Sequence, residues 1–251
     1  MKFYRLFFVF FLLFSLKSFA TAQSPDYLIV GIDTLRIQSN PLRDYFKDHP
    51  LSEKLITNLS SSNWRGYTAY FKFLNKKLVV DNIYKEEYKI DENGNANYFQ
   101  VSIYKDIFGE QDNFQCDFYS GLLICILGDV VDYVHLGYSS LYEKYNLIEI
   151  KKGLNIKSKE MTTEEFKKFR KDSFRYFKGT EEYKIKFNQF KEMGFSPEYS
   201  NSSFLIINPG TGRENESLKK KEAEFKIEKQ IDSFMFDFSN DFMKTIEIPI
   251  N

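Results

Sequence analysis

Apolar and polar residues alternate in short runs over the first two-thirds of the chain. In the run 67–73, Tyr, Ala, Phe and Phe occupy every second position, which is the two-residue period of a β-strand. Turn-forming residues at Gly31, Asn75 and Asn93-Gly94 separate such runs. This pattern predicts a series of antiparallel hairpins.

The segment 114–137 predicts three antiparallel strands, with two-residue turns at Ser120-Gly121 and Gly128-Asp129. Its middle run, LLICIL, is apolar at every position, which is typical of a central strand covered on both faces. A further hairpin is predicted around Lys152-Gly153.

Beyond Lys159 the apolar residues follow a helical period instead. Thr163 is the predicted cap of a helix that ends at Gly179, and a second helix and a charged helix over residues 216–232 follow. The predicted fold class is therefore α+β. An antiparallel β-rich domain over residues 23–158 precedes a helical C-terminal region over residues 159–251.

Residues 1–22 have the pattern of a signal peptide. Two early basic residues precede a ten-residue apolar run, and the small residues that signal peptidase requires follow. We expect cleavage between Ala22 and Gln23, and a periplasmic or secreted mature chain with no transmembrane segment. The alternatives are an N-terminal anchor or a buried helix, although the apolar run is shorter than the ~20 residues that span a bilayer.

Cys116 and Cys125 are the two cysteines of the chain. If Ser120-Gly121 is a two-residue turn, these cysteines lie opposite each other on the same face of a hairpin. An exported chain meets an oxidising compartment, so we predict a disulfide between them. The alternative is a buried pair of free thiols, because a core of this size needs no covalent bridge.

Several kinds of chemistry lack a sequence signature. The two cysteines are too far apart for a structural zinc site, and they have no histidine at ligand spacing. The GTGRENE segment completes no phosphate-loop motif, and 91-DENGNAN is typical of a hairpin turn rather than a calcium loop. With 35 basic and 35 acidic residues, the chain shows no basic excess for nucleic acid. We predict no cofactor, no metal and no catalytic residue.

Aromatic residues offer a candidate binding surface for a protein or glycan partner. Trp64, Tyr67 and Tyr138 are its predicted members, together with Tyr70 and Tyr133. The alternative is that these rings fill the core of the sheet domain. Acidic pairs, Asp129 with Asp132 and Glu110 with Asp112, leave a carboxylate-dependent hydrolase open.

Three phrases resemble an uncharacterised family of small bacterial proteins. They are GIDTLRIQSNPL, a W-R-G-Y-x-A strand within residues 62–84, and a Y-V-H-x-G-Y-x-S-x-Y-E segment within residues 132–145. The resemblance covers about residues 27–157 and implies no catalytic residue. Such domains accompany toxin systems as immunity proteins.

The expected function is that of an exported, non-catalytic binding or interaction protein of the bacterial envelope, with an immunity-type role included. This expectation rests on missing nucleophile, metal and phosphate signatures in a chain with an evident core. The alternative is a hydrolase of envelope polysaccharide or peptidoglycan that uses carboxylates.

Overall fold

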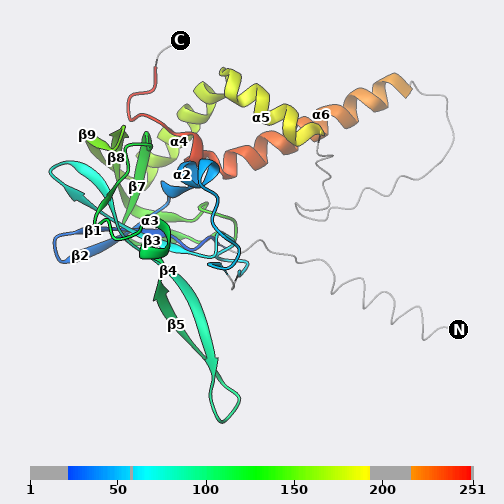
Figure 1. The fold of residues 1–251 in the computed structure, drawn as a ribbon. Coiled ribbons are helices and arrows are strands. Elements are labelled where there is room, and N and C mark those ends of the chain that lie inside the picture. The colour runs from blue at the N-terminus through cyan, green and yellow to red at the C-terminus, as the bar shows by residue number, and fades with distance from the viewer. Residues whose placement is uncertain (1–21, 57–58, 193–215, 250–251) are drawn as a thin grey trace, which may run out of the picture. The chain divides into compact units, whose positions relative to one another are not determined.

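A computed structural model describes residues 22–56, 59–192 and 216–249, and it confirms the α+β class (Figure 1). The described residues form two compact units, one of residues 22–176 and 238–249, the other of residues 177–192 and 216–237. The elements are β1 (Asp26–Val30), β2 (Asp33–Ile37), α2 (Leu42–Asp48), β3 (Thr68–Leu74), β4 (Lys77–Ile90), β5 (Ala96–Ser102), α3 (Tyr104–Phe108), β6 (Phe114–Gln115), β7 (Gly121–Asp132), β8 (Leu141–Lys151), β9 (Leu154–Thr162), α4 (Thr163–Lys178), α5 (Glu181–Glu192), α6 (Glu216–Asp237) and the 3₁₀ helix η2 (Ser239–Phe242).

The sheet of the larger unit returns upon itself. Its strands follow the order β3-β1-β2-β7-β8-β9-β4, and β3 also pairs with β4. All of these pairings are antiparallel except β1–β3. The long strand β4 has β3 on one edge, and β9, β6 and β5 pair with it one after another on the other edge.

Local turn chemistry forms the predicted hairpins. Asn75 and Lys76 have φ of 49° and 67° and join β3 to β4. Lys152 and Gly153 have φ of 47° and 75° and join β8 to β9. Positive φ at both central residues matches the right-handed twist of the flanking strands. The hairpins predicted around Gly31 and Asn93-Gly94 also form, as β1–β2 and β4–β5.

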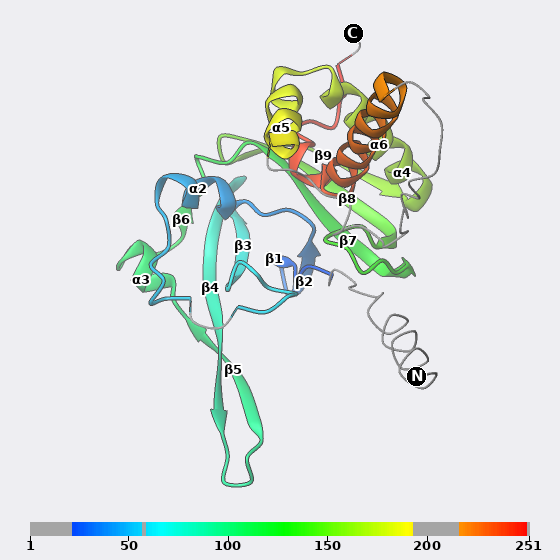
Figure 2. The ribbon, with the colours of Figure 1, turned by 90° about the vertical axis from the view of Figure 1, so that its right-hand side faces the viewer.

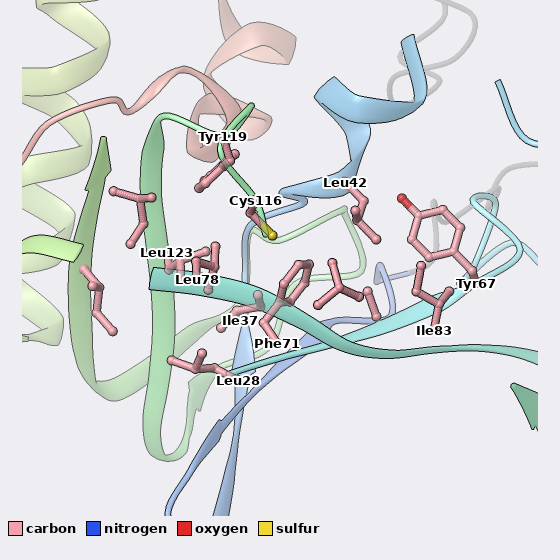
Figure 3. Close-up of a cluster of buried hydrophobic side chains, with 14 of the residues drawn as sticks. Leu28, Ile37, Leu42, Tyr67, Phe71, Leu78, Ile83, Cys116, Tyr119 and Leu123 are labelled. Atoms are coloured by element: carbon pink, nitrogen blue, oxygen red, sulfur yellow. The ribbon is translucent and has the colours of Figure 1, made fainter. Parts of the chain in front are cut away.

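The main core lies between this sheet and the helices α2 and α3. Figure 3 shows Leu28, Ile37, Phe71 and Leu123 from four different strands converging there, with Leu42 from α2 beside them. All five side chains are fully buried. Burying each one stabilises the fold by about 1.5–3 kcal/mol relative to exposure. Apolar residues from strands far apart in sequence therefore hold this sheet together.

A second core lies on the opposite face of β7 and β8. Leu122 and Ile124 of β7 pack there against Phe166 of α4, whereas Leu123 and Cys125 face the first core. The run LLICIL is thus covered on both faces, as its unbroken apolar sequence predicted. Tyr145 stacks on Phe166 with ring centroids 3.9 Å apart.

The three-stranded prediction for residues 114–137 is wrong. Strand β7 runs without a turn from Gly121 to Asp132, and Gly128 lies at a register shift in its pairing with β8. Residues 114–115 form β6, which pairs with β4. The edges of β7 pair with β2 and β8 instead of with residues 114–119, and its two apolar faces pack into two separate cores.

The predicted disulfide is absent for the same reason. Cys116 and Cys125, both in the described part of the chain, carry free, buried thiols. Cys125 pairs across the sheet with Asn146 and Ile37, and Cys116 follows β6 instead of facing it. The alternative of two buried free thiols is correct.

Burial makes these thiols poor nucleophiles. It raises the pKa of Cys116, an effect that Asp117 adds to, and it raises the pKa of Cys125 to about 12. We therefore expect alkylation of the native protein to stay slow up to about pH 9, where an exposed thiol with a pKa near ~8.5 is largely ionised. Mass spectrometry should find two labels after denaturation without reductant. If no label is found, the two cysteines form the disulfide that the sequence predicted.

Helix α4 begins at Thr163, the residue that its sequence suggested as the cap. The backbone N–H of Thr162 donates to Glu165 Oε2 at 2.8 Å, and Glu165 N donates back to Thr162 Oγ1 at 3.4 Å. This reciprocal pair is a capping box with Thr162, not Thr163, as the cap. The predicted domain boundary after residue 158 falls inside β9.

In the smaller unit, α5 and α6 contact each other through Phe190 and Phe234. The segment 238–249 belongs instead to the larger unit, where Met243 and Ile246 complete the second core. Residues 210–215, which make up most of the GTGRENE segment, lie outside the described residues.

Candidate functional site

A two-stranded arm extends from the larger unit (Figures 1 and 2). It consists of the distal half of β4 and all of β5, paired in register from Tyr84↔Ser102 to Ile90↔Ala96. Its tip is closed by Asp91, whose carboxylate accepts backbone hydrogen bonds from Asn93 and Asn95, both at 2.9 Å. The hydrogen bonds from the backbone of Asn95 and of Asn93 stabilise the carboxylate, so they hold the pKa of Asp91 below its usual value.

One face of the arm carries exposed apolar side chains near its tip. Tyr88, Ile90 and Tyr98 share this face and are 50%, 67% and 66% exposed. The two tyrosine rings form a cross-strand pair with centroids 5.9 Å apart. On the other face, Lys89 lies over the ring of Phe99, 5.4 Å from its centroid. The first face therefore offers aromatic contact area to a partner.

The outer edge of β5 offers backbone hydrogen-bonding groups. Asp91 N bonds Asn95 O, and Ile103 N bonds Ile83 O, each at 2.9 Å. Hydrogen-bonded pairs alternate with non-bonded pairs in an antiparallel ladder. The N–H and C=O groups of Ala96, Tyr98 and Gln100 therefore point away from β4. Among the strands of the described residues, only β4 pairs with β5.

A hollow of about 560 Å³ lies at the base of the arm, between β3, β4, β5 and the α3 region. Two lysines and two aspartates line it. Lys72 forms an ion pair with Asp81 at 2.7 Å across the bulge in β4, and Lys105 pairs with Glu110 at 2.5 Å outside the lining. The fourth charged residue of the lining is Asp112.

The rest of the lining is neutral and polar, and hydrogen bonds hold part of it in place. Ser102 Oγ donates to Asn82 Oδ1 at 2.6 Å, and Asn82 Nδ2 donates to the hydroxyl of Tyr84 at 2.9 Å. The Tyr104 hydroxyl donates to a backbone carbonyl and accepts from a backbone N–H. Asn113 completes the rim with a positive φ of 54°.

A row of partly buried tyrosines borders this hollow on the outer face of the sheet. Tyr27 stacks on Tyr70 with centroids 4.9 Å apart, and Tyr70 meets Tyr84 edge to face at 5.4 Å. Tyr84 in turn accepts the hydrogen bond from Asn82. Asn82, which lines the hollow, is thus connected to these tyrosine rings through its hydrogen bond to Tyr84.

The structure separates the residues of the predicted aromatic surface. Trp64 is 62% exposed, whereas Tyr67 is 4% exposed and packs in the main core against Phe46. The Tyr138 hydroxyl donates to Asn40 Oδ1 at 2.9 Å inside the protein. Tyr67 presents no surface to a ligand because its strand alternation places it inward.

Tyr67 and Tyr138 instead surround a buried ion pair. Arg65 donates to Asp26 at 2.9 Å and to the Ser24 carbonyl at 2.8 Å, and Asp26 also accepts from the Ala69 N–H at 2.9 Å. Loss of hydration raises the pKa of Asp26 against the effect of Arg65. Burial opposes the charge of Arg65, but the Asp26 carboxylate holds the pKa of Arg65 above its usual value. Sequence reasoning missed this pair.

The two predicted acidic pairs lie in different places, because Asp112 lines the hollow and neither Asp129 nor Asp132 does. Asp129 and Asp132 are exposed on the distal half of β7, away from the hollow's lining. Within residues 22–56, 59–192 and 216–249, no cluster of three or more His, Cys, Asp or Glu could hold a metal ion. The helices described there include none that is long and apolar enough to cross a membrane.

The predicted cleavage site lies where the described chain begins. Ala22 forms a bridge to Gly137, and the backbone N–H of Gln23 donates to the Gly137 carbonyl at 3.0 Å. The predicted leader itself lies outside the described residues, so the cleavage remains a prediction.

No protein-family model, curated protein or solved structure matches this chain. The function must therefore be argued from the arm and the hollow.

Proposed function

We propose that this chain is an exported, non-catalytic binding protein of the bacterial envelope, and that it captures an extended segment of a partner protein on β5. An immunity-type role is one form of such binding. The observation that carries the proposal is the outer edge of β5, whose sequence ANYFQVS contains no charged residue and no proline.

Sheet proteins usually protect such an edge with lysine, proline, a bulge or a covering element. β5 has regular pairing to β4 along its whole length and projects from the larger unit. An unprotected, regular edge suits the addition of a strand from another polypeptide. The partner's backbone would bond to Tyr98 and Gln100, and its side chains would extend the face formed by Tyr88 and Tyr98.

The proposal predicts a specific effect of proline at Gln100. The N–H of Gln100 points outward, so Gln100→Pro removes a bond to the partner while leaving the β4–β5 ladder intact. We expect partner capture from envelope extract to weaken by about tenfold or more. Gln100→Ala keeps the N–H and should capture normally. The measurement is quantitative pull-down with tagged mature protein, and circular dichroism checks the fold.

Two results would contradict this interaction. Equal capture by the proline and alanine variants would show that the β5 edge is not used. If sedimentation shows that wild type is a dimer and Gln100→Pro a monomer, the occupant of the edge is a second copy of this chain rather than another protein.

A hydrolase of envelope polysaccharide or peptidoglycan is the second candidate. The observation in its favour is that Asp81 and Asp112 line one hollow, as two carboxylates must in a glycosidase. Asp81 is already paired with Lys72, which favours binding over proton transfer. Turnover of peptidoglycan or glycans that disappears in Asp112→Asn would establish this alternative and remove the non-catalytic proposal.

A further inference from the structure

The geometry points to a second ligand site, distinct from the β5 edge: we propose that the hollow at the base of the arm binds a neutral saccharide. Its volume of about 560 Å³ lies within the ~300–1,000 Å³ typical of small-molecule sites.

The formal charges of the four charged side chains that line the hollow sum to zero, and Lys105 is also paired with Glu110 outside the lining. Lys72 and Lys105 oppose Asp81 and Asp112. A phosphate or another strong anion would meet two carboxylates, and a polycation would meet two ammonium groups, so each would be repelled as much as it was attracted. An uncharged ligand avoids both repulsions.

The lining contains both hydrogen-bond donors and acceptors. Lysine ammonium groups only donate, carboxylates only accept, and the amides of Asn82 and Asn113 and the hydroxyl of Ser102 do both. A sugar hydroxyl can donate and accept at once, so a set of neighbouring hydroxyls matches such a mixed wall. The bonds from Ser102 to Asn82 and from Asn82 to Tyr84 hold the Asn82 amide in one orientation before a ligand arrives.

The aromatic border suits the other side of a sugar ring. Tyr84 and Tyr70 lie against each other beside the hollow and are partly exposed. The C–H groups of a pyranose form an apolar face, which packs on aromatic rings while the hydroxyls reach polar groups. Few ligand classes other than saccharides combine no net charge, many hydroxyls and an apolar face.

The test uses Asn113→Gly. Because Asn113 has a positive φ, glycine keeps its backbone conformation and removes only the amide. The matched control is Asn75→Gly, which makes the same change at a φ of 49° in the β3–β4 turn, away from the hollow. NMR titration of the full mature chain would use glucose, galactose, mannose, N-acetylglucosamine and their disaccharides, with inorganic phosphate and free lysine as charged probes.

We expect at least one neutral saccharide to shift resonances of residues that line the hollow. Its affinity should fall about tenfold in Asn113→Gly and stay unchanged in Asn75→Gly. Gln100→Pro should leave this binding intact, which separates it from the partner interaction. The site is overturned if no saccharide of the panel binds, if only phosphate or lysine binds, or if Asn113→Gly binds as well as the control.

Discussion

Asp26→Asn should lower the free energy of unfolding by about 3–5 kcal/mol, the usual cost of removing one partner from a buried ion pair. The side chains of Asp26 and Arg65 are 0% and 4% exposed. Asparagine still accepts the Ala69 N–H but carries no charge, so it leaves the Arg65 guanidinium without a counter-charge in the interior. Urea denaturation followed by circular dichroism measures the change.

The control for this prediction is a surface ion pair. Lys105 and Glu110 are 70% and 84% exposed, so Glu110→Gln should change the stability by less than about 1 kcal/mol. The double variant Asp26→Leu with Arg65→Met removes both charges and should recover much of the loss. If Asp26→Asn behaves like Glu110→Gln, the buried pair does not stabilise the fold.

This ion pair also shows where sequence reasoning stops. Asp26 and Arg65 lie 39 positions apart, and neither belongs to a periodic pattern or a motif that would connect them. The hairpins at Asn75 and Lys152 could be predicted because the turn residues and their strands are neighbours in sequence. Local chemistry determines those pairings, whereas closure of the sheet determines the ion pair.

The same distinction explains the error at Ser120-Gly121. The dipeptide suits a two-residue turn, and a local hairpin was the simplest pairing for the strand that follows. β7 pairs instead with β2 and β8, and two separate cores bury its two apolar faces. The composition of LLICIL predicted that both faces of this strand would be buried, but it did not predict which strands would pair with it.

The candidate site also has one part that the sequence predicts and one part that it does not. The exposed tyrosines of the arm follow from the alternation on either side of Asn93-Gly94, which the sequence shows. The hollow does not, because its lining comes from three strands and the α3 region, and Asp81 enters it through a bulge that shifts the β3–β4 register.

Removing residues 238–251 should destabilise the sheet unit by more than about 4 kcal/mol, even though the sheet ends 76 positions earlier in sequence, at Thr162. Met243 and Ile246 are 3% and 7% exposed and pack against Leu122 and Ile124. The Glu149 carboxylate accepts the Ile246 N–H at 2.8 Å, which anchors the segment on β8. Without it, α4 would be left to cover this face, and part of the central strand would meet water.

Single substitutions test whether the core contacts of this segment, and not only its presence in the chain, stabilise the sheet unit. Met243→Ala and Ile246→Ala should each cost about 2–4 kcal/mol, as large-to-small changes in a core do. Glu247→Gln is the matched control within the same segment, because the Glu247 side chain is 79% exposed and its bond to Lys157 lies at the surface, where it contributes less than about 1 kcal/mol. Thermal and urea unfolding of the full chain and its variants measure these differences. A truncated chain that unfolds at the wild-type midpoint would show that α4 alone covers this face of the sheet.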